Sequence, residues 1–144
     1  MDLGCGTGYF LTMLSERLDP QGIVAADLSP GMIQYARQQR GNASDWVVAD
    51  AEALPLPDAS LDWVFSSLMI QWCDDTAAVA REVCRVLKPG GLLAFTFHHS
   101  EDAPWIDVLR SLFDAGFILV ATYPIRSDES KGEGGQFGSK KIQY

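Results

Sequence analysis

Residues 2–8 read DLGCGTG, and the expected fold follows from this stretch. Glycine stands at positions 4, 6 and 8, directly behind Asp2 and Leu3. A glycine-rich loop between a strand and a helix lets a ligand approach the backbone closely, because no Cβ intervenes. The spacing GxGxxG would favour a dinucleotide and its pyrophosphate, whereas this loop has the spacing GxGxG behind a carboxylate. Asp2 would repel a pyrophosphate and suits a ligand that carries an ammonium group.

Beyond the loop, turn signals divide the chain into alternating helices and strands. Helical spacing and caps predict helices over residues 7–18, 29–40, 74–88 and 100–116. Short apolar runs predict strands over residues 22–27, 45–50, 61–68, 92–97 and 117–123. This order predicts an α/β fold, a Rossmann-like three-layer α/β/α domain with a mostly parallel sheet. The length of 144 residues suits a single domain over 1–144, in which 124–144 form a polar, flexible tail.

Caps and apolar spacing give more specific expectations for three helices. Ser29 is the predicted N-cap of the second helix, with Pro30 at its first position. The third helix is expected to stop at the PGG of residues 89–91. Ser100 is the predicted N-cap of the last helix, and Gly116 its C-terminal cap. Helical spacing places the apolar stripe of that helix on Trp105, Ile106, Leu109, Leu112 and Phe113.

Carboxylates stand beside three predicted strands, in the region where doubly wound sheets bind ligands. Asp2 opens the glycine loop, and Asp27 ends the next strand, the usual place of a carboxylate that grips a ribose diol. Asp50, followed by Ala51, can accept a hydrogen bond from an exocyclic amine such as adenine N6. Met32 can lie against a purine face. An amine, a ribose and an adenine in this order describe S-adenosylmethionine better than NAD.

Four motifs resemble those of class I S-adenosylmethionine-dependent methyltransferases. They are DLGCGTGYF (2–10), ADLSPGM (26–32), VADAEALPLPDASLDWVFSS (48–67) and RVLKPGGLLAF (85–95), so the resemblance covers residues 1–97. It implies S-adenosylmethionine as cofactor, no metal, and catalysis that rests on positioning. The cofactor-binding residues that it implies are Asp2, Gly4, Cys5, Gly6, Asp27, Leu28, Met32, Asp50, Ala51 and Ser66.

The stretch SSLMIQWCDD (66–75) is similar to the malonyl-carrier-protein O-methyltransferases of biotin synthesis. This resemblance implies a small-molecule or carrier-bound acceptor, with a carboxylate as the methylated group. Gln71 and Trp72 are the candidate substrate-binding residues. His98 is the candidate base for an acceptor that must lose a proton, whereas a carboxylate needs none. Residues 98–130 resemble weakly the end of adenine-specific DNA methylases, but SSLM stands where those enzymes carry a DPPY-type stretch.

Net charge and cysteine spacing argue against several other classes of function. The sequence has 11 basic and 19 acidic residues, and its formal net charge of −8 argues against a nucleic-acid partner. No segment has the roughly 20 apolar residues of a membrane span, and the N-terminus lacks the plan of a signal peptide. Cys5, Cys73 and Cys84 follow neither zinc-site nor disulfide spacing. We therefore expect free thiols in a cytoplasmic protein.

The two ends of the predicted sheet leave an alternative function open. The residues before the glycine loop are too few for a full first strand, and KIQY (141–144) would only begin a last one. A sheet truncated at these strands has an exposed edge, through which two copies can pair as a homodimer. The main alternative is therefore a truncated or fused methyltransferase fragment that binds cofactor weakly and catalyses nothing. An NAD-dependent oxidoreductase fits the fold but not the loop spacing.

Overall fold

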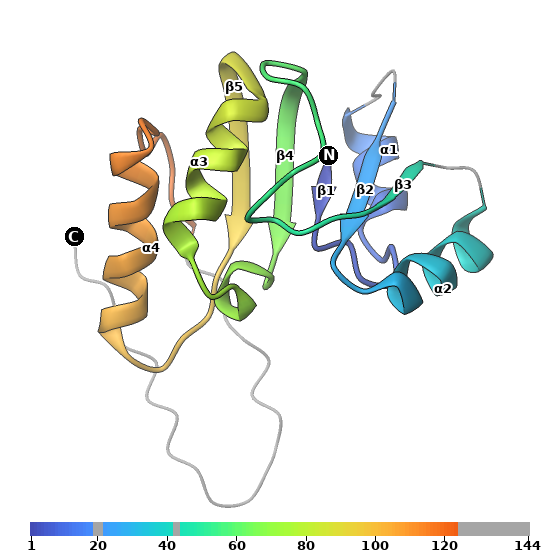
Figure 1. Ribbon diagram of the computed structural model, residues 1–144, viewed down its shortest axis with the longest axis horizontal. Coiled ribbons are helices and arrows are strands. Elements are labelled where there is room, and N and C mark those ends of the chain that lie inside the picture. The colour runs from blue at the N-terminus through green and yellow to red at the C-terminus, as the bar shows by residue number, and fades with distance from the viewer. Residues whose placement is uncertain (19–21, 42–43, 124–144) are drawn as a thin grey trace, which may run out of the picture.

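A parallel sheet of five strands forms the middle layer of the molecule. The computed structural model describes residues 1–18, 22–41 and 44–123. The strands lie in the order β3-β2-β1-β4-β5, and every pair of neighbours is parallel (Figure 1). Their bounds are Asp2–Leu3 (β1), Val24–Asp27 (β2), Asp45–Val48 (β3), Leu61–Ser67 (β4) and Leu87–Thr96 (β5). The predicted parallel α/β sheet is thus confirmed.

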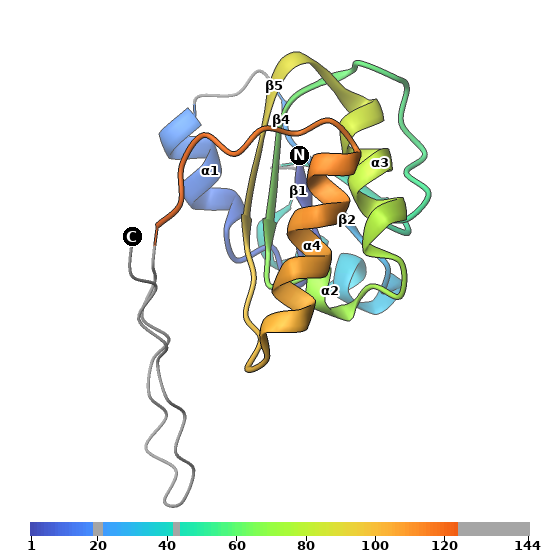
Figure 2. The same cartoon turned by 90° about the vertical axis from the view of Figure 1, so that its left-hand side faces the viewer.

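Helices cover both faces of this sheet. Their bounds are Leu11–Leu18 (α1), Pro30–Arg40 (α2), Thr76–Val86 (α3) and Asp102–Asp114 (α4), with a 3-10 turn η1 at Ile70–Trp72. The α3 and α4 helices lie on one face and α1 on the other, as the side view shows (Figure 2). Leu14 of α1 and Ile33 of α2 pack in one cluster around Ala25 of β2. The three-layer architecture is therefore the predicted one.

The short strand β1 lies at the centre of the sheet and pairs on both sides. Asp2 and Leu3 are in register with Ala25 and Ala26 of β2, and Asp2 also faces Phe65 of β4. Leu3 is 1% exposed and belongs to the cluster that packs the sheet against α3. Two residues are therefore enough to join the β2 and β4 sides of the sheet and to place the glycine loop at its edge.

Arg85 of α3 anchors the long connection between β3 and β4 to that helix. All five N–H groups of the Arg85 guanidinium donate hydrogen bonds, two of them to the carbonyl oxygens of Leu54 and Leu56 at 2.9 and 2.8 Å. The others reach the carboxylates of Asp58 and Glu82 at 2.6–2.9 Å. Glu82 in turn accepts the Leu54 N–H at 2.7 Å. The planar fork of arginine suits this set of partners, which lysine could not match.

Helix α2 begins as the sequence predicts. Ser29 is its N-cap and accepts the Met32 N–H at 3.3 Å, and Pro30 is the first helical residue. Helix α3 ends at Val86, just before the expected stop, but the PGG of 89–91 lies inside β5 rather than in a loop. Gly90 has φ +79°, which a side chain would disfavour, and the register with β4 shifts between the pairs Leu61–Leu87 and Trp63–Leu92, so the glycines lie at an irregularity in the strand.

The last helix differs from its prediction at both its start and its buried stripe. Its N-cap is Glu101 rather than Ser100, and the Glu101 N–H donates to His99 Nδ1 at 3.1 Å. The buried residues of α4 are Val108 and Leu112. Of the remaining stripe residues, Leu109 is half-buried, and Ile106 and Phe113 are 52% and 50% exposed. Trp105 is 38% exposed and packs edge-to-face on Phe97, with ring centroids 4.8 Å apart. The helix packs on the domain chiefly through Val108 and Leu112, so the predicted stripe overstates its contact.

Residues 117–123 were expected to form a strand, and this prediction is wrong. The Phe117 N–H donates to the Leu112 carbonyl at 3.0 Å, and the following residues pair with none of the five strands described. Ile118, Val120 and Tyr123 are 74–83% exposed. An apolar, β-branched run favours a strand only where a neighbour offers its backbone. The expected tail 124–144 lies outside the described residues, as does the KIQY strand start.

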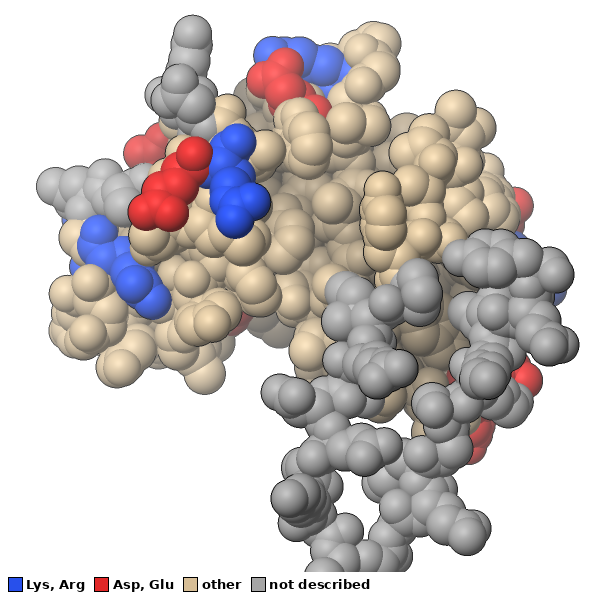
Figure 3. Space-filling model, turned by 180° about the vertical axis from the view of Figure 1, so that it is seen from behind, with Lys and Arg blue, Asp and Glu red and all other residues tan. Residues whose placement is uncertain are grey.

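The face of β4 and β5 on the α1 side is only partly covered. Trp63 and Leu92 are cross-strand neighbours there, and each is 42% exposed. Viewed from this side, the middle of the surface carries no charged side chain among the residues shown (Figure 3). The expected homodimer through an exposed edge of the sheet stays a prediction.

The contact row of α4 can be tested with two substitutions in that helix. We expect Leu112→Ala to lower the free energy of unfolding by roughly 2–5 kcal/mol, because the buried side chain leaves a cavity. Ile106→Ala should change it by less than about 0.5 kcal/mol, since that side chain is exposed. Urea denaturation of both variants measures the difference. Equal losses would show that the wider stripe of the sequence prediction is the buried one.

Candidate functional site

The sequence-predicted residues converge on one edge of the sheet. Because all five strands run parallel, their carboxyl ends meet at the lower edge in Figure 1. The glycine loop follows β1 there, Asp27 ends β2, and Asp50 stands two residues beyond β3. The turn that carries Gln71 follows β4, and His98 follows β5. Loops at this edge form the ligand-binding crevice of doubly wound sheets.

Asp27 connects the glycine loop to helix α2. Its Oδ2 accepts the Gly6 N–H at 2.9 Å, and its Oδ1 accepts the Ser29 N–H at 2.9 Å. Each carboxylate oxygen has a second lone pair, so both can accept one more hydrogen bond. Asp27 thus shapes the loop and keeps acceptor capacity for a ligand with hydroxyl groups.

The three glycines of the loop have different surroundings. Gly4 has φ +75°, and a Cβ built on it would lie 2.3 Å from Met69 Cγ, so its missing side chain makes room for Met69. A Cβ on Gly8 would crowd the helices and β3 instead. Gly6 has φ +51°, and no atom lies within 4 Å of its Cβ position. Of the three, only Gly6 therefore presents its backbone to open space, where a ligand can approach.

Asp2 is buried at the root of the same loop. Its side chain is 1% exposed, and its Oδ2 has no hydrogen-bond partner among the residues that the structure describes. Burial raises the pKa of this carboxyl to about 6; the charge of Asp27 raises it further, and the terminal ammonium group of Met1 opposes the rise. An unpaired buried carboxylate oxygen is costly unless a donor reaches it. A ligand ammonium group is such a donor, so the site fits the ligand class that the sequence predicts.

Cys5 has a structural role in this loop. Its side chain is 7% exposed and packs with Leu11 and Leu14 of α1. Burial, with the charges of Asp2 and Asp27, raises the pKa of the thiol to about 12. Cys5 is therefore a neutral thiol at physiological pH, and only its backbone is suited to a ligand.

Apolar side chains are exposed beside the carboxylates. Leu28 is 68% exposed and Met32 45% exposed, directly after Asp27. Tyr9, at the far end of the glycine loop, is 72% exposed. Exposed apolar groups next to acceptors match a ligand with a flat apolar ring and polar substituents.

The third carboxylate belongs to a chain of hydrogen bonds that the sequence did not reveal. Asp50 Oδ1 accepts the Glu52 N–H at 2.9 Å, and the following Ala51 is buried. Glu52 Oε1 accepts the N–H groups of Asp74 and Asp75 at 3.0 and 2.9 Å, just before α3. The partners of Glu52 are more than 20 residues away, so no local capping pattern signals its role.

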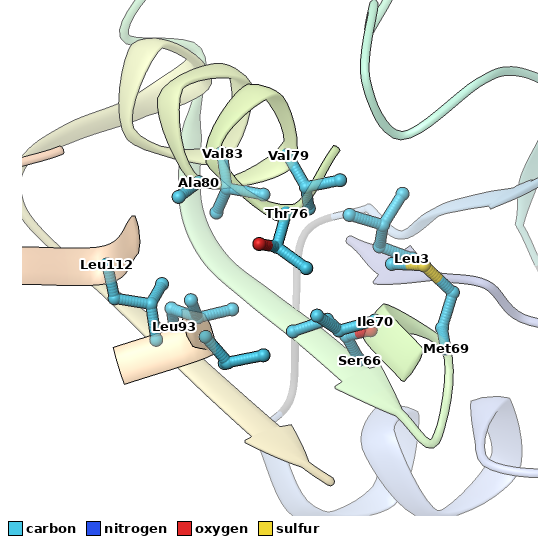
Figure 4. A pocket seen from close by; sticks show the side chains of 11 residues that line it. Leu3, Ser66, Met69, Ile70, Thr76, Val79, Ala80, Val83, Leu93 and Leu112 are labelled. Carbon is cyan, nitrogen blue, oxygen red and sulfur yellow. The ribbon is translucent and has the colours of Figure 1, made fainter. Parts of the chain in front are cut away.

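The remaining candidates divide into two groups. Gln71 Oε1 accepts the His98 N–H at 3.3 Å, so the structure brings these two together, and the neighbouring Trp72 is 81% exposed. Ser66 is 1% exposed, and it lines a small apolar cavity between the sheet and helices α3 and α4 (Figure 4). Its Oγ has no partner in the described part of the chain. The Ser66 side chain is thus buried against this cavity.

The described residues hold neither a cluster of metal ligands nor a helix that could span a membrane. Within residues 1–18, 22–41 and 44–123, no group of three or more His, Cys, Asp or Glu side chains is arranged to hold a metal ion. In the same ranges, every helix is too short or too polar to cross a membrane.

A protein family and several known proteins match the part of the chain that carries most of these candidate residues. The model of a family described as "Methyltransferase domain" matches residues 1–95. Malonyl-acyl-carrier-protein O-methyltransferase of Serratia marcescens is 47% identical over 96 residues, which are 67% of this chain and 36% of that protein. The biotin biosynthesis bifunctional protein BioHC of Cellvibrio japonicus is 47% identical over 91 residues, 63% of this chain and 18% of that one. The chain spans about a third or less of the length of these relatives.

A solved structure supports the fold. The crystal structure of a SAM-dependent methyltransferase from Aquifex aeolicus superposes with a TM-score of 0.69 at 25% identity, covering 80% of this chain and 69% of that one. The resemblance of residues 1–97 to methyltransferases is thus confirmed, whereas that of residues 98–130 to DNA methylases lies mostly beyond the matched region and stays a prediction. With residues 1–95 of its 144 matched by the family model, the chain belongs to the methyltransferase-domain family.

Proposed function

We propose that the protein binds S-adenosylmethionine at the carboxyl edge of the sheet and transfers its methyl group to a carboxylate. The buried, unpaired Oδ2 of Asp2 at the root of the glycine loop carries this proposal. A pyrophosphate would meet a negative charge there, whereas the ammonium group of the methionine moiety supplies the missing donor. Family membership and the SAM-dependent structural relative support the same cofactor.

Each part of the site has a role in holding the cofactor. Asp2 accepts from the ammonium group, and the free lone pairs of Asp27 accept from the ribose hydroxyls. Leu28 and Met32 offer apolar surface to the adenine ring, and Asp50 with Ala51 lies at its polar edge. When bound, S-adenosylmethionine supplies a methyl group activated by the sulfonium charge. The chain contributes orientation and the exclusion of water.

A carboxylate acceptor demands the least of the residues at this edge of the sheet. An ionised carboxylate is already nucleophilic at neutral pH, so no side chain has to remove a proton. His98 then serves through its backbone N–H, which orients the Gln71 amide. Gln71 and the exposed Trp72 stand where an acceptor can reach the edge of the site. The Serratia relative is named for a malonyl group on a carrier protein, which supports a carrier-bound carboxylate as acceptor.

Cofactor binding is tested by calorimetric titration with S-adenosylhomocysteine. We expect Asp27→Ala to weaken binding roughly 10- to 100-fold, or about 1–3 kcal/mol, because the variant removes acceptors and loosens Gly6. Asp62→Ala is the matched control, since Asp62 stands at the opposite edge of the sheet and pairs with Lys88. An unmodified chain that melts cooperatively and yet binds no S-adenosylhomocysteine would contradict the proposal and favour the fragment without cofactor function.

The elevated pKa of Asp2 predicts a pH dependence of the same affinity. With a pKa of about 6, Asp2 is charged at pH 7 and mostly neutral at pH 5. An ammonium ligand favours the charged form, so we expect S-adenosylhomocysteine to bind roughly tenfold more weakly at pH 5. Asp2→Asn should bind weakly at both pH values. Titrations at pH 5, 6 and 7 measure this, and an unmodified chain with a flat profile would show that Asp2 does not face the ammonium group.

The contribution of Asp2 to the free energy of unfolding should fall as the pH rises, whereas the affinity for S-adenosylhomocysteine should rise. Asp2 binds its proton more tightly in the folded chain, where its pKa is about 6, than in the unfolded chain, where it is near 3.8. The folded state is therefore favoured below pH 4 by this group, and that contribution is lost as the pH rises through 6. Asp2→Asn should remove a pH-dependent difference on the order of 3 kcal/mol, measured by urea denaturation across this range.

The nature of the acceptor is tested with radiolabelled S-adenosylmethionine. We expect label on a malonyl-carrier protein that mild alkali converts to volatile methanol, because a methyl ester hydrolyses to methanol and an N-methyl group does not. A carrier loaded with the corresponding malonamoyl group, which has no free carboxylate, is the matched control. Label on the control, or label that alkali does not convert to methanol, would rule out a carboxylate acceptor while leaving cofactor binding intact.

A further inference from the structure

The turn after β4 has an unusual backbone that is firmly held. Leu68 has φ +53°, in the left-handed region that a branched side chain disfavours. Its N–H donates to the Thr96 carbonyl and to Thr96 Oγ1, each at 3.1 Å. Thr96 Oγ1 also shares a hydrogen bond of 3.0 Å with Ser67 Oγ. A conformation of this kind persists only where its surroundings impose it, and it clusters at functional sites.

The strained turn places the Met69 side chain against the glycine loop. A Cβ on Gly4 would lie 2.3 Å from Met69 Cγ and 2.5 Å from Met69 Cβ, so the Met69 side chain lies directly against the Gly4 backbone. The sulfur of Met69 is 3.3 Å from Cys73 Sγ on its other side. Met69 also lines the apolar cavity together with Leu3 and Ile70 (Figure 4). It therefore separates the root of the glycine loop from the space beneath α3 and α4.

We propose that Met69 is a positioning residue for the cofactor site. The turn at Leu68 presses Met69 on Gly4 and thereby holds the loop where the Gly6 N–H meets Asp27 and the Gly6 α-carbon faces open space. The part of this inference that concerns ligand affinity rests on the proposed function, whereas the part that concerns loop order does not. Methionine suits the position because its unbranched chain fills the irregular space between backbone and cavity.

A smaller side chain at position 69 would extend the cavity to the back of the loop. Gly4 and Cys5 would keep their N–H bonds to the Ala26 carbonyl at 2.8 and 2.9 Å, so the sheet should survive. The loop beyond them would lose its packing partner and sample more conformations. Leucine, by contrast, conserves most of the volume and should keep the loop in place.

Hydrogen exchange of the ligand-free protein tests the loop directly. We expect exchange in residues 6–8 to speed up in the order Met69→Leu, Met69→Val, Met69→Ala, with at least a tenfold rise for alanine. Exchange in the α3 helix should change less than threefold in the same samples. Met13→Ala is the matched control, because Met13 is an exposed methionine on α1. In parallel, S-adenosylhomocysteine should bind at least tenfold more weakly to Met69→Ala and within threefold of normal to Met69→Leu.

The outcomes separate this inference from the proposed function. Unchanged loop exchange in Met69→Val and Met69→Ala would overturn the positioning role, whatever the affinity. Faster exchange throughout the protein would overturn it as well, since Met69 would then be a general core residue. If exchange becomes faster only in the loop, and the unmodified protein does not bind S-adenosylhomocysteine, the positioning role of Met69 is supported and the proposed cofactor is ruled out. If Met69→Ala does not fold, the comparison of the leucine and valine variants decides.

Discussion

The carboxylate of Asp27 accepts two backbone N–H groups, from Gly6 and from Ser29, and the site depends on this pair of bonds. One bond fixes the glycine loop, and the other fixes the start of α2, whose N-cap is Ser29 itself. A carboxylate at the end of β2 is thus a structural element before any ligand arrives. Its remaining lone pairs are directed by the same bonds, so a ribose would meet acceptors that are already oriented. Structure and recognition share one side chain here, and a substitution at Asp27 disturbs both.

Much of the fold and part of the site could be predicted because they depend on local patterns. Short apolar runs between helical stretches require a parallel sheet, and a parallel sheet brings Asp27, Asp50 and the glycine loop to one edge whatever the details. The different surroundings of the three loop glycines could not be predicted. The sequence shows that Gly4 lacks a Cβ, but the group that uses the space is Met69, 65 positions further along. The bonds of Glu52 to the backbone before α3 were hidden for the same reason.

Two predictions were wrong because an apolar sequence pattern shows which side chains are suited to burial, but not whether another element covers them. Helical spacing placed Ile106 and Phe113 on the inward side of α4, yet both are half-exposed and the buried residues of that helix are Val108 and Leu112. Residues 117–123 have strand composition, but their backbone pairs with no strand of the described sheet. Burial requires a complementary element, and sequence periodicity cannot tell whether one is within reach.

The two-residue length of β1 has a consequence for how the molecule holds together. On one side of β1 lie β2 and β3, and on the other lie β4 and β5, so the backbone ladder across the middle of the sheet depends on this short strand. Side chains bridge the same seam, because Leu3, Ala26 of β2 and Val64 of β4 pack with α3 in one cluster. Local opening starts where few backbone bonds hold neighbouring strands together. A ligand on the glycine loop, which follows β1 directly, would hold this seam closed, and the apparent stability of the whole domain would then report on its occupancy.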